Sequence, residues 1–210
     1  NDLAFAKCEY LKEVDLSKCT KLNYVGYMAF GSCENLLSID LSNCTELKIL
    51  GNNAGSIGPF NECKRLKQMI LPPNLEIIDS DTFRSCDLEE IEMPSSVKQI
   101  KSGAFDIYNL REIKMYSYEP VISQSTFTSE ITKNATLKVP SGQLSKYKEA
   151  EHWKEFLSIE EYNPNGGDLI HHSIQVSYNE GSVKLNDNYI ENGSSVSVTD
   201  QTDIRLLIQP

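Results

Sequence analysis

Residues 30–41 read FGSCENLLSIDL, and this arrangement returns as FAKCEYLKEVDL from Phe5, FNECKRLKQMILP from Phe60 and FRSCDLEEIEMP from Phe83. Each copy begins with a phenylalanine, places a cysteine three residues later, and continues as L-x-x-φ-x-φ, where φ is apolar. Successive copies begin 25, 30 and 23 residues apart. A period of about 20 to 50 residues is the signature of repeat architectures in which each repeat forms one structural unit. The chain is therefore predicted to stack repeated coils.

Two further copies extend the repeat. The fifth begins at Phe105 and has Tyr108 in the cysteine column, and Phe127 opens a degraded sixth. The end of each L-x-x-φ-x-φ pattern alternates like a short strand, and another apolar column returns the chain to the next phenylalanine. One coil of about 23 residues cannot enclose a core, so stacking must bury these columns. The predicted inward residues on the strand side are Leu11, Val14, Leu16, Leu36, Ile39, Leu41, Leu66, Met69, Leu71, Leu88, Ile91, Met93, Leu110, Ile113 and Met115, and those on the return are Leu22, Val25, Leu47, Leu50, Leu75, Ile78, Val97 and Ile100.

The six cysteines follow the repeat and not a metal-binding spacing. No C-x-x-C pair is present, and the three histidines (His152, His171 and His172) lie more than 60 residues beyond Cys86. Equivalent residues of stacked coils lie about 5 Å apart, so the column is predicted to form a ladder of buried free thiols. Disulfides between neighbours are the alternative in an oxidising compartment, and a catalytic thiol would lack a histidine base within the repeat. The ladder comprises Cys8, Cys33, Cys63 and Cys86, and the second cysteines Cys19 and Cys44 are expected to face inward as well.

The composition argues against nucleic-acid, membrane and enzymatic functions. Thirty acidic residues against 20 basic ones give a formal charge of −10, which opposes binding to phosphate backbones and anionic membranes. No run approaches the roughly 20 apolar residues of a membrane helix, and no secretory leader is present, although a leader could have been removed before Asn1. No G-x-S-x-G, Walker or H-E-x-x-H motif occurs. We therefore expect a non-enzymatic protein that needs neither cofactor nor metal and does not insert into a membrane.

The repeat resembles the leucine-rich repeats of the BspA-like, or Treponema-type, surface proteins, whose unit reads roughly F-x-x-C-x-x-L-x-x-I-x-L-P-x-x-V-x-x-I-x-x-x-A-F. The resemblance covers residues 3–140 and rests on the fragments quoted above together with SSVKQIKSGAF at 95–105. It implies an α/β solenoid, a leucine-rich repeat whose short strands form a curved sheet with an irregular or short helical convex side. It also implies a bacterial cell-surface or extracellular protein that binds protein or glycan. The first two copies depart from the pattern, since they read DLSKCTKL and DLSNCTEL where later copies have a proline.

The repeat loses its register after Phe127 and ends with a predicted strand, ATLKVP at 135–140. The next segment, SGQLSKYKEAEHWKEF, has apolar residues at an approximate helical spacing and is predicted to cap the solenoid. It is similar to the terminal segment of BspA-like repeats in Bacteroides-type surface proteins. A ligand platform built on Trp153, the single tryptophan, is the alternative. The apolar positions are Leu144, Tyr147, Ala150, Trp153 and Phe156, and the repeat domain with its cap is predicted to span 1–161.

A second module is predicted after a linker at 162–168, YNPNGGD. Residues 169–210 alternate in short runs at 174–178, 182–185, 195–198 and 204–208, separated by turn signals at 179–181, 186–188 and 192–193. This pattern indicates a β meander. The module resembles the first half of the small β modules related to internalin B repeats, so it is expected to be incomplete.

Three weaker signals each have a structural and a functional interpretation. GNNAGSIGP at 51–59 coincides with the lengthened second copy, so an insertion loop is favoured over a phosphate cradle. His171 and His172 are interpreted as the start of a solvated strand, with a metal or pH-sensing site as the alternative. Asp187 and its asparagine neighbours are typical of a hairpin turn, with calcium binding as the alternative.

The candidate partner-binding site is the outward face of the strands. The residues between the inward ones include Ser38, Gln68, Ile70 and Lys114, and carboxylates dominate, which predicts recognition of a cationic or hydrogen-bonding partner. Reversing the charges of Asp15, Asp40, Glu90 and Glu92 is expected to abolish binding without affecting folding. A merely solvated face, or a structural spacer within a larger surface protein, is the alternative, and an exposed apolar or aromatic cluster on this face would argue against a spacer. The candidate residues are Glu13, Asp15, Asp40, Glu90, Glu92, Glu112 and Tyr116.

Overall fold

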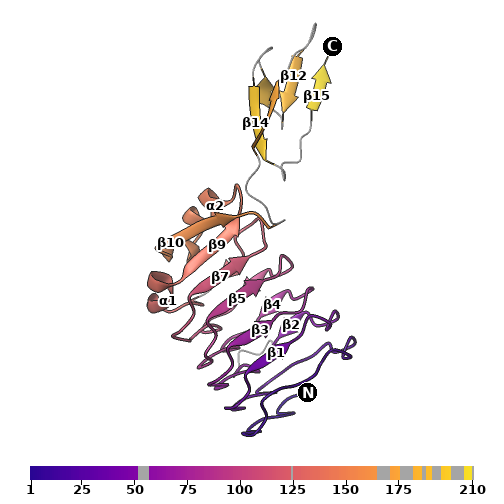
Figure 1. Ribbon diagram of the computed structural model, residues 1–210, viewed down its shortest axis with the longest axis vertical. Coiled ribbons are helices and arrows are strands. Elements are labelled where there is room, and N and C mark those ends of the chain that lie inside the picture. Colours follow the sequence, from indigo (N-terminus) through magenta and orange to yellow (C-terminus); the bar gives the residue numbers. More distant parts are fainter. Residues whose placement is uncertain are drawn as a thin grey trace. The chain divides into compact units, whose positions relative to one another are not determined.

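The protein is described from a computed structural model, which covers residues 1–51, 57–123 and 125–164, together with the backbone of five strands between 171 and 209. The chain divides into two compact units, 1–164 and 165–210, and each is described by itself. Figure 1 shows the first unit as a ladder of coils. The predicted solenoid is thereby confirmed.

The strand side of unit 1 consists of short parallel strands, which begin in the second coil. They are formed by the alternating ends of the L-x-x-φ-x-φ patterns, which place every second side chain inside the coil. These strands form two sheets, ordered β1-β3 and β5-β7-β9-β10, and all their pairings are parallel. The strands are β1 (Ser38–Asp40), β3 (Gln68–Ile70), β5 (Glu90–Met93), β7 (Glu112–Met115), β9 (Thr136–Pro140) and β10 (Ser158–Tyr162).

The return side of the coils carries a second parallel sheet. Its two-residue strands are paired without interruption in the order β2-β4-β6-β8, and a bridge from Val25 to Leu50 adds the first coil. The Phe–Cys corner of each coil is made of turns, so the described part of 1–128 holds no helix. Of the two predicted forms of the convex side, irregular or short helical, the structure has the irregular one. The strands are β2 (Ile49–Leu50), β4 (Ile77–Ile78), β6 (Gln99–Ile100) and β8 (Ile122–Ser123).

The core lies between these sheets and contains the predicted inward residues. From the second coil onward they are all buried, whereas their counterparts between Leu11 and Leu22 in the first coil are half-buried. The repeated phenylalanines stack along the Phe–Cys corner, with neighbouring ring centroids 5.0–5.9 Å apart. Aromatic rings at this spacing stabilise a fold by more than the burial of their surface area alone. The stacked rings are those of Phe5, Phe30, Phe60, Phe83, Phe105 and Phe127.

Hydrogen bonds between neighbouring coils hold three cysteines of the ladder in place. Cys33, Cys63 and Cys86 each donate their S–H to the carbonyl of the phenylalanine one coil earlier, over 3.0, 3.1 and 3.1 Å. All six thiols are free. Burial raises the pKa of Cys63 to about 12, so these thiols stay protonated and unreactive. Cys44 is also buried, as predicted.

Two of the six cysteines do not follow the prediction. Cys8 is exposed. Cys19, in the same coil, is only half-buried. Tyr108 occupies the cysteine position of the fifth coil, but 75% of it is exposed, because a phenol is too large for the space that a thiol fills.

The last coil is covered by residues 128–164. Trp153 and Phe156 meet the ring of Phe127 edge-on, at centroid distances of 5.6 and 5.2 Å. The buried Trp153 donates its indole N–H to the carbonyl of Val121 over 2.8 Å, which excludes it as an exposed ligand platform.

The single helix predicted over 144–156 is wrong in detail. The structure has α2 (Leu144–Glu149) and a separate 3-10 turn (Trp153–Glu155), because His152 adopts a positive φ of 66° that no helix tolerates. A further helix, α1 (Ser129–Asn134), precedes β9, and the hydroxyl of Thr128 accepts the N–H of Ile131 at its start.

The boundary of unit 1 also lies beyond the predicted one. Tyr162, assigned to the linker from sequence, ends β10 and donates its hydroxyl to the carbonyl of Met115 over 2.8 Å.

Unit 2 contains five short antiparallel strands. The predicted meander is wrong in topology, since β11 pairs with β14 and β12 lies between β13 and β15. The segment at Asn188, expected to lie in a turn, starts a strand. The strands are β11 (His171–Gln175), β12 (Ser182–Leu185), β13 (Asn188–Ile190), β14 (Ser195–Thr199) and β15 (Leu206–Gln209).

Candidate binding surface

The predicted surface is defined here as the strand face, formed by the side chains that alternate with the inward residues of β1, β3, β5, β7, β9 and β10. The parallel register aligns these side chains in rows across the coils. Asp40 lies beside Ile70, Glu90 beside Glu112, and Glu92 beside Lys114. The carboxylates Glu13, Asp15, Asp40, Glu90 and Glu92 are exposed, and Glu112 and Tyr116 are half-buried.

Asp15 and Asp40 have a structural role in their coils. Their Oδ1 atoms accept the backbone N–H of Ser17 and Ser42, over 2.9 and 2.8 Å, two residues further along the chain. Hydrogen bonds from Ser17 lower the pKa of Asp15. Aspartate commonly closes a turn in this way, and here it does so in the two DLS copies that lack the later prolines. Charge reversal at these two positions would therefore disturb the turns, contrary to the expectation from sequence.

The carboxylates toward the end of the strand face are paired with lysines. Lys114 lies 3.1 Å from Glu92, and Lys138 lies 2.9 Å from Glu112. Tyr116 donates its hydroxyl to Glu92 over 2.9 Å, and the hydrogen bonds of Lys114 with Tyr116 and Glu92 raise the pKa of Lys114. The acidic stripe predicted from sequence is thus neutralised from β7 onward.

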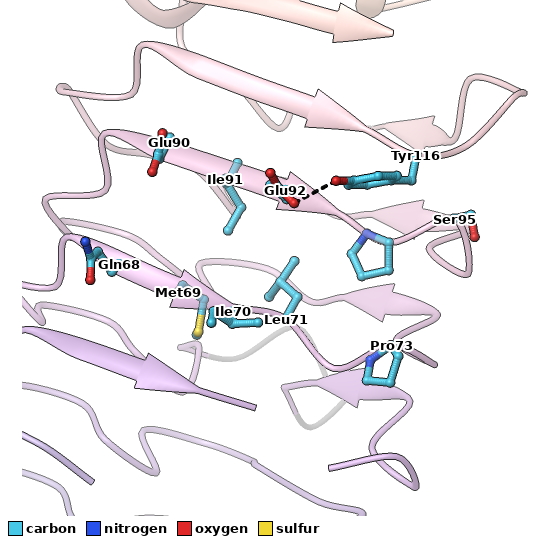
Figure 2. Close-up of a pocket in the computed structure, with 11 residues that line it drawn as sticks. Gln68, Met69, Ile70, Leu71, Pro73, Glu90, Ile91, Glu92, Ser95 and Tyr116 are labelled. Carbon is cyan, nitrogen blue, oxygen red and sulfur yellow. Dashed lines mark hydrogen bonds between the residues drawn. The ribbon is translucent and has the colours of Figure 1, made fainter. Parts of the chain in front are cut away.

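A hollow of about 690 Å³ opens between β3 and β5. Ile70 projects there with 53% of its surface exposed, and Tyr116 closes one end (Figure 2). Two acidic side chains, Glu90 and Glu92, come from β5. The lining residues are Gln68, Met69, Ile70, Leu71, Pro73, Glu90, Ile91, Glu92, Pro94, Ser95 and Tyr116.

The hollow lies at the interruption between the two strand-side sheets. Within the described residues no backbone hydrogen bond joins β3 to β5, and the last bond before this gap runs from the N–H of Asp87 to the carbonyl of Leu66, over 3.2 Å. On the return side β4 and β6 remain paired. The third and fourth coils are therefore held together on one side and unpaired on the other.

A one-residue difference in the repeat accounts for this interruption. The first three coils read C-x-x-L, whereas the fourth reads Cys86-Asp87-Leu88 and the fifth has the same short spacing before Leu110. Because the Phe–Cys corners fix the start of each coil, a shorter connection changes where the strand meets its neighbour. Coils with the same spacing before the leucine pair, as β1 with β3 and β5 with β7, and the two coils that differ in this spacing do not.

Sequence reasoning placed Glu90, Glu92 and Tyr116 at the binding surface but missed the hollow. Ile70 stands in a column that is otherwise charged, and the C-x-L spacing begins at Cys86. These two departures from the repeat were the available signals.

The other candidate sites receive little support. Residues 52–56 of the glycine-rich loop and Asp187 lie outside the described residues, and the side chains of His171 and His172 are likewise not described. At Gly51 an added Cβ would lie 2.3 Å from the Cβ of Asp79, so this glycine permits close approach of two coils. No group of three metal-binding side chains occurs in the described part of the chain.

Stacked parallel coils with inward leucine columns and an outward strand face define a leucine-rich-repeat solenoid. A family model, the BspA type leucine rich repeat region, matches the chain in six copies over residues 1–57 and 48–150. The chain therefore belongs to the BspA-type leucine-rich-repeat family. A search of curated proteins found no match. Among the described residues, no helix has the length and apolar character needed to span a membrane.

Proposed function

We propose that the protein is a non-enzymatic recognition protein that binds a protein or glycan partner through its strand face, with the hollow between β3 and β5 as the main contact. Membership of the BspA-type family supports this proposal, because proteins with these repeats are commonly surface adhesion or recognition proteins. The single observation that carries it is the exposed Ile70 in a hollow rimmed by Glu90 and Glu92.

The alternative is a spacer, whose repeats only provide length. A spacer needs polar strand faces and continuous pairing, and neither holds between β3 and β5. An apolar side chain exposed in a concave site with convergent polar groups is instead typical of a binding site. One exposed apolar side chain, Ile70, lines the hollow beside the half-buried Tyr116, and this favours recognition over a spacer.

We further propose a location for the protein and a role for each segment that follows the repeats. We place the protein outside the cell or on a bacterial cell surface. In this proposal residues 128–161 act as the cap of the solenoid, and residues 169–210 form a β module related to internalin B repeats that holds the solenoid away from its attachment.

The proposal is tested by binding of the chain to an array of extracellular-matrix proteins and glycans at low and physiological salt. The blocking variant carries Ile70→Lys and Glu90→Lys. The matched control carries Ile122→Lys, which replaces an isoleucine 62% exposed on the return side, and Glu151→Lys in the exposed turn after α2. A partner lost in the blocking variant and kept in the control supports the proposal. No partner at micromolar concentration, or equal binding by both variants, contradicts it and favours the spacer.

A further inference from the structure

The geometry points to an arginine side chain of a protein partner as the group that the hollow between β3 and β5 accepts. This inference rests on the proposed function, and it goes further by choosing between protein and glycan. It follows from the charges, the apolar surfaces and the covered aromatic ring of the hollow.

The charges of the hollow favour a cation. Two of its lining residues are glutamates, and none is a lysine, arginine or histidine. Glu92 is engaged by Lys114 and Tyr116, whereas Glu90 is exposed and has no ion pair within the described part of the chain. Asp40 adds a third carboxylate beside Ile70 in the row across the strands. A cationic group entering the hollow would therefore supply a counter-charge for Glu90.

The apolar part of the hollow fits the stem of a long basic side chain. Ile70 lies beside Asp40 in the row across β1 and β3, and Pro94 lines the hollow together with Ile70. Figure 2 shows Ile70 and Pro73 in the hollow. Arginine covers apolar surface with its methylenes while its charged end reaches a polar rim. Its planar guanidinium binds one carboxylate through two parallel N–H donors, which a lysine ammonium cannot do. Glu90 is the carboxylate available for this contact.

A glycan fits the same hollow less well. Sugar rings pack against the open face of an aromatic side chain, and Tyr116 is the only aromatic residue that lines the hollow. The ammonium of Lys114 lies over this ring, 5.1 Å from its centroid, and the ring of Tyr162 meets it at 5.9 Å and 84°. Tyr116 is thus held in place by neighbours and offers limited free surface.

The methionine methyl groups provide a direct readout of the hollow. The chain has four methionines, and Met69 lines the hollow while Met93 and Met115 are fully buried. The full chain, labelled with methyl-13C methionine, is titrated by NMR with acetyl-Val-Arg-Val-amide and with the same peptide carrying lysine or citrulline. Maltoheptaose and chitohexaose serve as glycan probes. We expect saturable shifts of the Met69 methyl signal with the arginine peptide at millimolar concentrations, and at least about fivefold weaker binding of the neutral citrulline peptide.

Two variants separate charge recognition from general damage. Glu90→Gln should weaken arginine-peptide binding roughly threefold to tenfold, because it removes the bidentate acceptor. Glu151→Gln makes the same change in the exposed turn after α2, outside the strand face, and should leave binding unchanged. Methyl spectra of both variants that match the original at Met93 and Met115 show that the core is intact.

Equal binding of the arginine and citrulline peptides, or no Met69 shift with any peptide, overturns the inference. A Met69 shift with a glycan alone overturns it in favour of a sugar site. In these cases the proposed function is judged separately, by whether the array partner is lost in the blocking variant.

Discussion

Replacing Phe60 by alanine should destabilise the solenoid by about 4 kcal/mol. Phe60 is fully buried in the middle of the phenylalanine column, and its ring stacks on Phe30 and Phe83 at centroid distances of 5.4 and 5.9 Å. Truncating a buried phenylalanine to alanine costs about 3–5 kcal/mol through lost transfer energy and the cavity left behind. Two lost ring contacts place this site in the upper half of that range. The cavity cannot close readily, because backbone hydrogen bonds at the Phe–Cys corner hold this coil to the coil before it and to the coil after it.

The assay is urea unfolding followed by the fluorescence of Trp153, the single tryptophan. Trp153 packs on Phe127 at the end of the same column, so its emission reports on the unfolding of unit 1. The control is Tyr108→Ala at the Phe–Cys corner, where 75% of the side chain is exposed and the expected change is less than about 0.5 kcal/mol. A loss of less than about 1 kcal/mol for Phe60→Ala would refute the argument that the stacked rings contribute strongly to the stability of the solenoid.

Two further predictions concern backbone strain and pH. Gly51→Ala should lower the free energy of unfolding in urea by more than about 2 kcal/mol, because the φ of Gly51 is 121° and the new Cβ would meet Asp79. Gly142→Ala is the control and should cost only about 1 kcal/mol, because Gly142 has a φ of 80° but no neighbour within 4 Å. Equal losses in the two variants would contradict this account. The melting temperature should fall as the pH rises from about 8.5 toward 12, because unfolded thiols ionise near 8.5 while burial raises the pKa of Cys63 to about 12 and keeps the folded thiol protonated. Cys63→Ala should reduce this alkaline slope in a thermal-shift titration, and an unchanged slope would show that other groups cause it.

Much of the first unit could be predicted because burial follows the sequence pattern directly. An apolar residue at a fixed position in each copy must face the stacked neighbours, so the leucine columns were identified from spacing alone. The spacing also aligned the phenylalanines, but the stacking of their rings was found only in the structure. The same reasoning identified Cys33, Cys63 and Cys86 as buried free thiols. It did not find their S–H bonds to the phenylalanine carbonyls, because a sequence pattern does not show what a backbone group of the preceding coil offers.

Local backbone geometry was harder to predict. The apolar spacing of 144–156 indicated one helix, but a positive φ at His152 divides it so that Trp153 can reach the ring of Phe127. Asp15 and Asp40 looked like surface charges, since a carboxylate in an alternating strand pattern carries no sign of the N–H it will accept two residues later.

The sequence by itself determined the solenoid, because the period of the apolar residues specifies what each coil must bury. Only the tertiary structure decided where the strand face opens. A strand pairs with its neighbour only when the backbone N–H and C=O groups of both coils are in register. The residue missing between Cys86 and Leu88 therefore has its effect only because the preceding coil has the longer spacing. That mismatch leaves β3 and β5 unpaired and opens the hollow that Ile70 shares with the two glutamates of β5, which no column of the repeat shows when it is examined alone.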